Sequence, residues 1–246
     1  MRENRLYTEQ PLSVGACIEL EPRPAKHAAQ VLRLGAGEAL ILFNGDGRDV
    51  RAEIETSTRN QVAARILSVG EPEPAPALAI TLALGISRGE RMDLAIQKAV
   101  ELGVSGIQPL FSTRTLVRLS GARLAKRTQH WQGVAIAACE QSGRRRLPSI
   151  ATAATLDDWL GQAPPGGILL HHAAAKTLPE LPPPQQPVSL LIGPEGGLTP
   201  EEREQAQAHG FTPVRLGPRV LRTETAPLAA IAAIQTLWGD FRPVED

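Results

Sequence analysis

Two loops in the last quarter of the chain combine glycine with polar side chains in a way that could bind a ligand. The first reads Gly193-Pro194-Glu195-Gly196-Gly197-Leu198 and follows an apolar run at residues 188–192. Three glycines within five residues allow unusual backbone conformations and let a ligand lie directly against main-chain amides. Thr199, Pro200 and Glu202 then predict the capped start of a helix. The order of strand, glycine loop and helix favours a ligand site.

The second loop carries more functional groups than a turn needs. It reads Leu216-Gly217-Pro218-Arg219-Val220-Leu221-Arg222-Thr223-Glu224-Thr225-Ala226 and precedes an apolar segment with helical spacing. Thr223 or Thr225 could cap that helix, and capping is also an alternative role for Glu224. Capping does not explain Arg219 and Arg222. The second loop is therefore also a candidate for chemistry.

Binding of a nucleotide phosphate is one alternative for the glycine loop. The loop lacks the lysine followed by serine or threonine of the triphosphate motif, and it lacks the glycine spacing of the dinucleotide fingerprint. Both facts disfavour ATP and NAD. A tight turn that needs glycine and binds nothing stays open as the structural alternative.

The elements that must position these loops follow two different patterns. The first part predicts short strands at residues 39–43, 49–55 and 61–69, with a helix at residues 25–34 that is closed by Gly35. The later part alternates strands with helices, which is typical of a largely parallel α/β sheet. Its expected strands are residues 79–84, 107–110, 168–170, 188–192 and 214–216; its expected helices run from a Ser87 and Glu90 capping box to Leu102, over residues 123–139, and over residues 228–238.

A proline-rich segment separates the two patterns. Pro72, Pro74 and Pro76 alternate with other residues, and such spacing favours an extended, stiff linker. The sequence therefore predicts a small β-rich domain at residues 1–70, a linker at residues 71–77 and an α/β domain at residues 78–246.

Composition excludes several classes of protein. The 246 residues carry no net charge, and no apolar run approaches the roughly 20 residues that span a bilayer. The N-terminus does not resemble a secretory signal. Cys17 and Cys139 lie far apart, without the spacing of a disulfide framework or a zinc site. We expect a cytoplasmic protein without a membrane span or a bound metal.

Charge is nevertheless unevenly distributed. Residues 114–146 contain eight arginines and lysines against one acid, Glu140. In residues 150–213 the balance reverses, with seven acidic side chains against two basic ones. A basic surface attracts a phosphate backbone even on a neutral protein. The alternative is an ordinary solvated helix face.

The two loops together closely resemble the RsmE family of the SPOUT superfamily, and further segments extend the resemblance over nearly the whole chain. These segments are Val31-Leu32-Arg33, Ser87-Arg88-Gly89-Glu90, Glu101-Leu102-Gly103-Val104 and Glu140-Gln141-Ser142-Gly143-Arg144. The resemblance implies an α/β fold, with an N-terminal PUA-like β-barrel and a C-terminal SPOUT domain that holds a trefoil knot. It also implies a homodimer that methylates N3 of one uridine in 16S ribosomal RNA of the small ribosomal subunit, with S-adenosylmethionine as cofactor.

The resemblance carries site residues over to this chain. The implied cofactor contacts are Leu170, Ile192, Gly193, Glu195, Gly197, Leu216, Gly217, Leu221, Thr223 and Ala226. A methyltransferase must align a methyl group with the uridine N3 and help that nitrogen lose its proton. Arg222 is the candidate to stabilise the uracil oxygen that gains charge, and Glu224 is the candidate base or orienting group.

Basic residues in both parts are candidates for RNA contact. They are Arg5, Arg23, Arg33, Arg88, Arg144 and Arg146. Because aromatic residues make up only 3% of the chain, we expect shape and backbone charge, rather than base stacking, to hold the RNA. Two other functions stay open: an RNA-binding or ribosome-assembly protein without catalysis, and a SPOUT enzyme that acts on transfer RNA.

Overall fold

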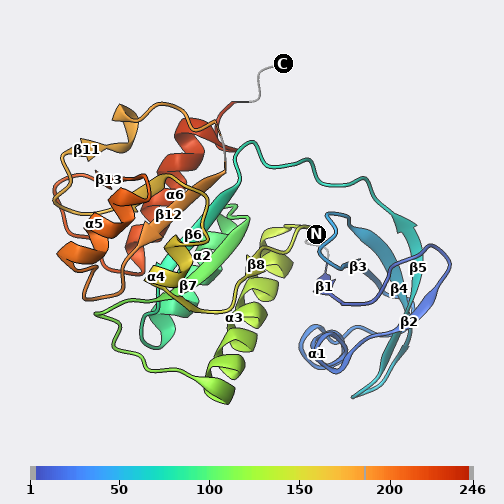
Figure 1. Ribbon diagram of the computed structural model, residues 1–246. Coiled ribbons are helices and arrows are strands. Elements are labelled where there is room, and N and C mark those ends of the chain that lie inside the picture. The colour runs from blue at the N-terminus through green and yellow to red at the C-terminus, as the bar shows by residue number, and fades with distance from the viewer. Residues whose placement is uncertain (1–3, 186, 244–246) are drawn as a thin grey trace. The chain divides into compact units, whose positions relative to one another are not determined.

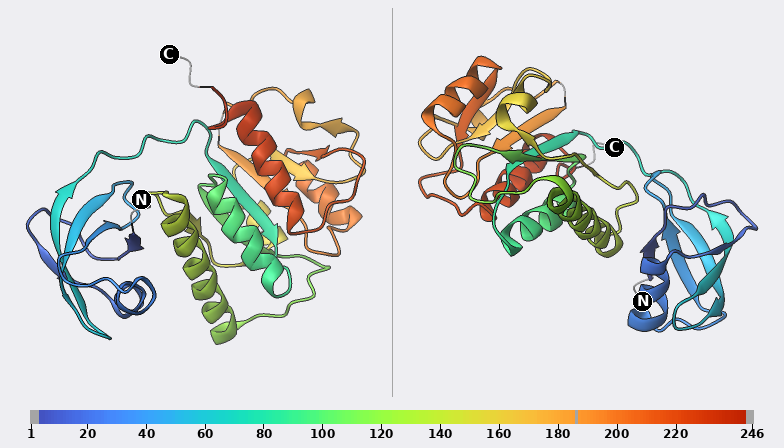
Figure 2. Two further views of the ribbon diagram at one scale, coloured as in Figure 1. Left: turned by 180° about the vertical axis from the view of Figure 1, so that it is seen from behind. Right: turned by 60° about the horizontal axis from the view of Figure 1, so that its bottom comes forward.

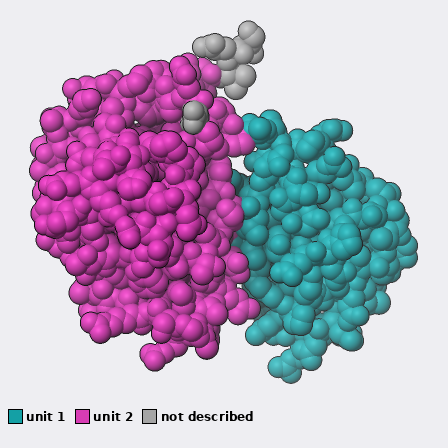
Figure 3. Space-filling view, in the orientation of Figure 1, with its two compact units in different colours: residues 1–75, 136–147 teal, residues 76–135, 148–246 magenta. Residues whose placement is uncertain are grey.

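The computed structural model describes residues 4–185 and 187–243, which form two compact units. One unit contains residues 1–75 with 136–147, and the other contains residues 76–135 with 148–246 (Figures 1 and 3). The sequence gives no sign that residues 136–147 belong with the first unit. The predicted domain limits at residues 70 and 78 stay a prediction.

The first unit is built around a twisted five-stranded sheet. Its strands are β1 (Arg5–Tyr7), β2 (Cys17–Glu19), β3 (Ala39–Phe43), β4 (Val50–Ser57) and β5 (Val62–Val69), in the order β1-β3-β4-β5-β2. β1 runs parallel to β3, and the other pairs are antiparallel. Alternate residues of β4 are buried, as period-two patterning requires when one face of a sheet covers a core.

The short helix of this unit ends earlier than the sequence predicts. It consists of α1 (Pro22–Lys26) and a π-helical turn, η1 (His27–Leu32), and it closes at Arg33, which adopts a left-handed conformation with φ of 57°. The amide of Leu34 donates to the carbonyl of Ala28, 2.9 Å away. Gly35 is therefore not the closing residue, because this wide last turn already ends the helix at Arg33.

The second unit is an eight-stranded parallel sheet with helices on both faces. The strands are β6 (Ile80–Gly85), β7 (Gly106–Phe111), β8 (Ser149–Ile150), β9 (Ala154–Thr155), β10 (Gly167–Leu170), β11 (Lys176–Thr177), β12 (Val188–Ile192) and β13 (Phe211–Arg215). The order is β11-β13-β10-β12-β6-β7-β8, and β9 also pairs with β7. The sequence prediction of a parallel α/β sheet is confirmed, whereas the last strand begins at Phe211 rather than at residue 214.

The helices form two layers on this sheet. Helices α4 (Leu156–Leu160) and α5 (Pro200–Ala208) pack with Leu169 and Leu191 on one face. A 3₁₀ turn, η2 (Leu178–Glu180), follows β11 in the chain. Helices α2 (Glu90–Glu101), α3 (Gly121–Ser142) and α6 (Thr225–Trp238) lie on the opposite face (Figure 2). Strand β12 is buried along its whole length because both faces are covered.

Helix starts test the capping predictions. Thr199 accepts a hydrogen bond from the amide of Glu202, whose carboxylate accepts one from the amide of Thr199, so the capping box of α5 is confirmed. The Ser87 and Glu90 box is wrong: α2 starts after Gly89, and the buried Ser87 hydroxyl donates to the carbonyl of Gly85.

Candidate functional site

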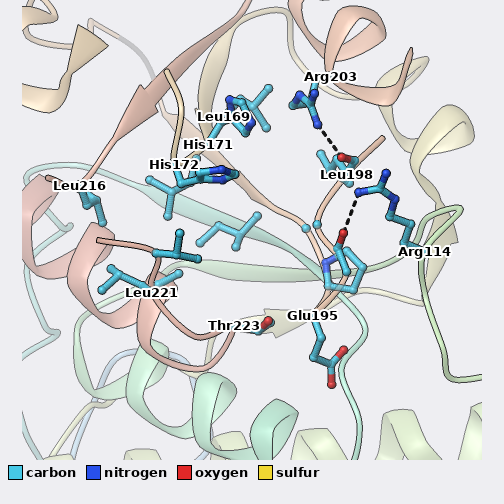
Figure 4. A pocket seen from close by; sticks show the side chains of 18 of the residues that line it. Arg114, Leu169, His171, His172, Glu195, Leu198, Arg203, Leu216, Leu221 and Thr223 are labelled. Atoms are coloured by element: carbon cyan, nitrogen blue, oxygen red, sulfur yellow. Dashed lines mark hydrogen bonds between the residues drawn. The ribbon is translucent and has the colours of Figure 1, made fainter. Parts of the chain in front are cut away.

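Three loops meet at the carboxyl ends of the adjacent strands β12, β10 and β13. They surround a pocket of about 270 Å³ (Figure 4). Open parallel sheets bind ligands at this end because the loops that follow neighbouring strands converge there. The pocket is lined by Arg114, Leu169, Leu170, His171, His172, Ile192, Gly193, Pro194, Glu195, Gly196, Gly197, Leu198, Arg203, Leu216, Arg219, Val220, Leu221, Thr223 and Ala226.

The structure brings nearly all predicted cofactor contacts together around this pocket. Those that line it are Leu170, Ile192, Gly193, Glu195, Gly197, Leu216, Leu221, Thr223 and Ala226. Gly217 does not line it; with φ of +77°, this residue instead turns the chain after β13 in a conformation that glycine favours. The two loops singled out in the sequence therefore form one pocket.

Close backbone approach explains glycine at two positions around the loop after β12. A Cβ atom on Gly193 would lie 2.9 Å from the carbonyl carbon of Gly197 and from the amide nitrogen of Leu198. A Cβ atom on Gly85, at the end of β6, would lie 2.7 Å from the carbonyl carbon of Gly193 and closer still to Pro194. Since no real Cβ atom tolerates such distances to backbone, the glycine loop packs directly on β6 and on itself.

Glu195 is held at one wall of the pocket by main-chain and side-chain donors. Its Oε1 accepts hydrogen bonds from the Arg88 amide at 2.9 Å and from Arg91 Nη1 at 3.4 Å. Burial by itself would raise the pKa of Glu195, but the donors from Arg88, from its own amide and from Arg91 outweigh burial and lower the pKa. Glu195 is therefore an anion near neutral pH.

Arg91 connects the two loops. Besides its contact with Glu195, its Nε lies 3.9 Å from Glu224 Oε2 in an ion pair. Both carboxylates are largely buried, with side chains 17% exposed, while Arg91 is 48% exposed. One arginine on α2 thus pairs with an acid from each loop, although the pairs are weak because solvent screens the arginine.

The two predicted catalytic residues lie beside the pocket rather than in its lining. Arg222 is exposed, and its carbonyl accepts the amides of Thr225 and Ala226 at the start of α6. Glu224 occupies the position before the first residue of α6, but its side chain makes no capping hydrogen bond. Thr223 and Thr225 do not cap α6 either, so a helix cap does not explain these polar residues.

Two arginines of the pocket were not predicted from the sequence. Arg114 Nη1 donates to the Gly196 carbonyl at 3.0 Å, and Arg203 Nη1 donates to the Leu198 carbonyl at 2.7 Å (Figure 4). Both side chains hold main-chain groups of the glycine loop. Arg114 follows β7 and Arg203 lies within α5, and neither is part of a local sequence motif. Only the tertiary fold brings them to the glycine loop.

His171 and His172 form another wall of the pocket. Their rings meet edge to face with centroids 4.9 Å apart. Burial, followed by the charges of Arg203 and His172, lowers the pKa of His171, so its imidazole is neutral at physiological pH. A neutral imidazole can both donate and accept a hydrogen bond to a ligand.

The predicted RNA contacts differ in how far their side chains are available. Arg33 and Arg88 are exposed; Arg23 is 46% exposed and lies 3.5 Å from Glu140 Oε2. Arg146 is exposed and donates through Nη2 to the Glu73 carbonyl at 3.0 Å, while Arg144 is partly buried. Each of these five arginines keeps some exposed surface for a ligand, unlike Arg5.

Arg5 has a packing role that the sequence did not indicate. Its side chain is 12% exposed and pairs with Asp49 at 2.6 Å. The guanidinium lies 5.1 Å from the centre of the Phe43 ring, and Nη2 donates to the Arg144 carbonyl. Arg5 is therefore committed to its own unit, and it is not among the RNA contacts proposed below.

We expect Arg5→Ala to lower the free energy of unfolding by about 2 kcal/mol. This value lies between the effect of an exposed ion pair, below about 1 kcal/mol, and that of a buried one, about 3–5 kcal/mol. Urea denaturation followed by circular dichroism measures it. Arg51→Ala is the control, because Arg51 is an exposed arginine of β4 and its loss should cost below about 0.5 kcal/mol. Equal effects of the two substitutions would contradict the packing role.

The described residues show neither a membrane-spanning helix nor a cluster of metal ligands. No helix there has the length and apolar character to cross a membrane. No cluster of three or more histidine, cysteine, aspartate or glutamate side chains in the same part of the chain is arranged to hold a metal ion.

Comparison with known protein families places the chain among RNA methyltransferases. The family described as RNA methyltransferase domain matches residues 73–235, and the family described as RNA methyltransferase PUA domain matches residues 23–67. Among curated proteins, the ribosomal RNA small subunit methyltransferase E of Buchnera aphidicola subsp. Schizaphis graminum is 34% identical, over 96% of this chain and 97% of its own length. The Bacillus subtilis protein of the same name is 26% identical, over 95% and 96% of the two chains.

Solved structures agree over almost the full length. A ribosomal RNA small subunit methyltransferase E from Neisseria gonorrhoeae, bound to S-adenosylmethionine, is 40% identical with a TM-score of 0.91, over 98% of this chain and 100% of that chain. A Legionella pneumophila methyltransferase in complex with the same cofactor is 41% identical with a TM-score of 0.94, over the same shares. The fold is thus α/β with an N-terminal PUA-like domain. The chain belongs to the RsmE family of RNA methyltransferases.

Proposed function

We propose that this protein binds S-adenosylmethionine in the pocket of Figure 4 and methylates N3 of a specific uridine in 16S ribosomal RNA of the small ribosomal subunit. The observation that carries the proposal is the convergence of the two resembling loops on one pocket, in a chain 40% identical to a structure with that cofactor bound. The uridine and its N3 position rest on the family resemblance.

The residues present fit the proposed cofactor. Gly193 and Gly197 leave main-chain groups uncovered by side chains, and Ile192, Leu216 and Leu221 supply apolar walls. A flat, partly apolar adenosine requires both kinds of surface, because its edge needs hydrogen bonds and its faces need apolar contact. We assign to cofactor binding the remaining predicted residues of the lining as well: Leu170, Glu195, Thr223 and Ala226.

The cofactor, when bound, supplies an electrophilic methyl group on a sulfonium. The protein must then hold the uracil so that N3 lies in line with that methyl group, which lowers the barrier by fixing the geometry. Ionisation of N3, with its proton passing to Glu224 or to water, would place negative charge on the neighbouring uracil oxygens. N3 would then take the methyl group as the bond between that carbon and sulfur breaks. A cationic side chain at those oxygens would stabilise this charge.

We assign the cationic role to Arg222 and the role of base or orienting group to Glu224. Both lie on the loop whose other residues line the pocket, so a nucleotide at the pocket mouth can reach them. The Arg91 Nε atom, 3.9 Å from Glu224 Oε2, restrains that carboxylate. Held in this way, the Glu224 carboxylate could accept a hydrogen bond from the uracil N3–H or take up its proton.

We assign RNA contact to the arginines that keep exposed cationic surface: Arg23, Arg33, Arg88, Arg144 and Arg146.

We also propose a homodimer. Val220, on the pocket loop, is 74% exposed, and Leu94 on α2 is 40% exposed, so apolar surface on this unit could be covered by a second copy. Light scattering after gel filtration measures the mass of the particle in solution.

A cytoplasmic location follows from the proposed substrate, since ribosomes are assembled there.

Mass mapping of ribosomal RNA from a deletion strain tests the substrate. We expect one N3-methyluridine to disappear from the small-subunit RNA and to return when the gene is restored. An unchanged N3-methyluridine would eliminate this substrate and would favour the transfer RNA alternative if a modification were lost there instead.

Calorimetric titration with S-adenosylmethionine tests the other alternative, an RNA-binding or assembly protein without catalysis. We expect saturable binding. If S-adenosylmethionine did not bind at millimolar concentration, the assignment as an enzyme would be contradicted.

A further inference from the structure

The loop between β7 and α3 borders another, open pocket, which none of the site residues above lines. Its volume is about 430 Å³. It is lined by Phe111, Ser112, Thr115, Val117, Arg118, Leu119, Ser120 and Arg123. The charged members of this lining are two arginines, and no acidic side chain accompanies them. The pocket is therefore a concave surface of positive charge.

Both arginines are free for a ligand. Within residues 4–185 and 187–243, neither Arg118 nor Arg123 has an ion pair or a hydrogen bond to its side chain, and both are exposed. In contrast, the guanidinium of Arg114, in the same loop, donates a hydrogen bond to the Gly196 carbonyl. Two arginines on one concave surface without a carboxylate beside them are an arrangement suited to an external anion.

The loop that carries this pocket is fixed to the cofactor loop. The amide of Thr113 donates to Glu202 Oε1 at 2.7 Å, and Arg114 holds Gly196 at 3.0 Å. The amide of Ser112 donates to Thr115 Oγ1 at 2.9 Å, which closes the first turn. Arg118 follows Arg114 by four residues and so lies within about 14 Å of it along the chain. The pocket thus has a defined place beside the proposed methyl-transfer site.

We propose that Arg118 and Arg123 bind a backbone phosphate of the RNA, near the nucleotide that is methylated. Guanidinium groups match phosphate oxygens in geometry and charge, and the hydroxyls of Ser112, Thr115 and Ser120 are further donors on the same cavity. This contact positions the RNA and does not read its sequence. The inference rests on the proposed function, because it takes the anion to be RNA.

The test compares two double variants of the full-length protein that remove the same charge. Arg118→Ala/Arg123→Ala empties the pocket of cations, whereas Lys126→Ala/Arg127→Ala removes two charges from α3 outside it. Fluorescence anisotropy with unmethylated small ribosomal subunits, and with their deproteinised RNA, measures affinity across salt concentrations. We expect the pocket variant to lose about tenfold in affinity and the control about twofold. The slope of log affinity against log salt should fall by about 0.7 to 0.9 in the pocket variant, for one lost phosphate contact.

Equal losses in the two variants would overturn the site, since they would show that only general charge attracts the RNA. Unchanged affinity of the pocket variant would overturn it as well. Calorimetry with S-adenosylmethionine should give the wild-type dissociation constant for the pocket variant, because these arginines do not line the cofactor pocket. A failure of the proposed function would be seen separately, because the unaltered protein would then not methylate the small-subunit RNA.

Discussion

Arg222→Ala is expected to lower kcat by about 10²- to 10³-fold, the usual effect of removing one donor at a position where charge develops. The dissociation constant for S-adenosylmethionine should stay within about threefold of wild type, since Arg222 is exposed and does not line the cofactor pocket. Single-turnover methylation of unmethylated small subunits gives the rate, and calorimetry gives the cofactor affinity.

Arg219→Ala is the matched comparison, because Arg219 lies three residues earlier on the same loop and does line the pocket. It should raise the KM for S-adenosylmethionine more than it lowers kcat. If Arg222→Ala weakens cofactor binding as much as turnover, Arg222 belongs to the cofactor site. Arg222→Lys should recover only part of the rate, since lysine keeps the charge but loses the planar pair of donors.

Gly85→Ala is expected to weaken S-adenosylmethionine binding by at least about tenfold. The new methyl group would lie 2.7 Å from the carbonyl carbon of Gly193 and would also strike Pro194, so the glycine loop must move away from β6. Overpacking of this kind costs about 1–3 kcal/mol, because backbone cannot yield as a flexible side chain does. The displaced loop also carries the main-chain groups that we assign to the cofactor.

Gly133→Ala is the control for the same chemical change. A Cβ atom at Gly133, in the middle of α3, has no heavy atom within 4 Å. Alanine favours helix over glycine by about 0.8–1.0 kcal/mol, so this variant should be at least as stable as wild type and should bind the cofactor normally. Thermal unfolding and calorimetry of both variants distinguish loop displacement from a general effect. Normal cofactor affinity in Gly85→Ala would show that the glycine loop tolerates the shift.

Local interactions are what the sequence determined well. Buried parallel strands appear as apolar runs, so β6 and β12 were predicted nearly to their ends. The capping box at Thr199 closes within three residues, and it formed as predicted. The two glycine-bearing loops could be singled out because their residues are contiguous, and the proposed cofactor contacts then followed from the family resemblance.

The helix-capping expectations failed where tertiary packing placed the side chain elsewhere. Ser87 and Glu90 have the spacing of a capping box, yet Ser87 is buried and bonds to Gly85. Likewise, Thr223 lines the pocket instead of capping α6. A local motif offers a hydrogen bond, but burial decides which polar groups must be satisfied.

The tertiary structure alone decided which cations are free. The sequence shows a basic segment with eight arginines and lysines but does not rank them. Arg5 is occupied by Asp49 and Phe43, and Arg114 by Gly196, whereas Arg118 and Arg123 face an open cavity. The partners of Arg5 and Arg114 all lie at least 38 residues away in the chain. Sequence determines the charge of a residue; only long-range packing determines whether that charge is already neutralised.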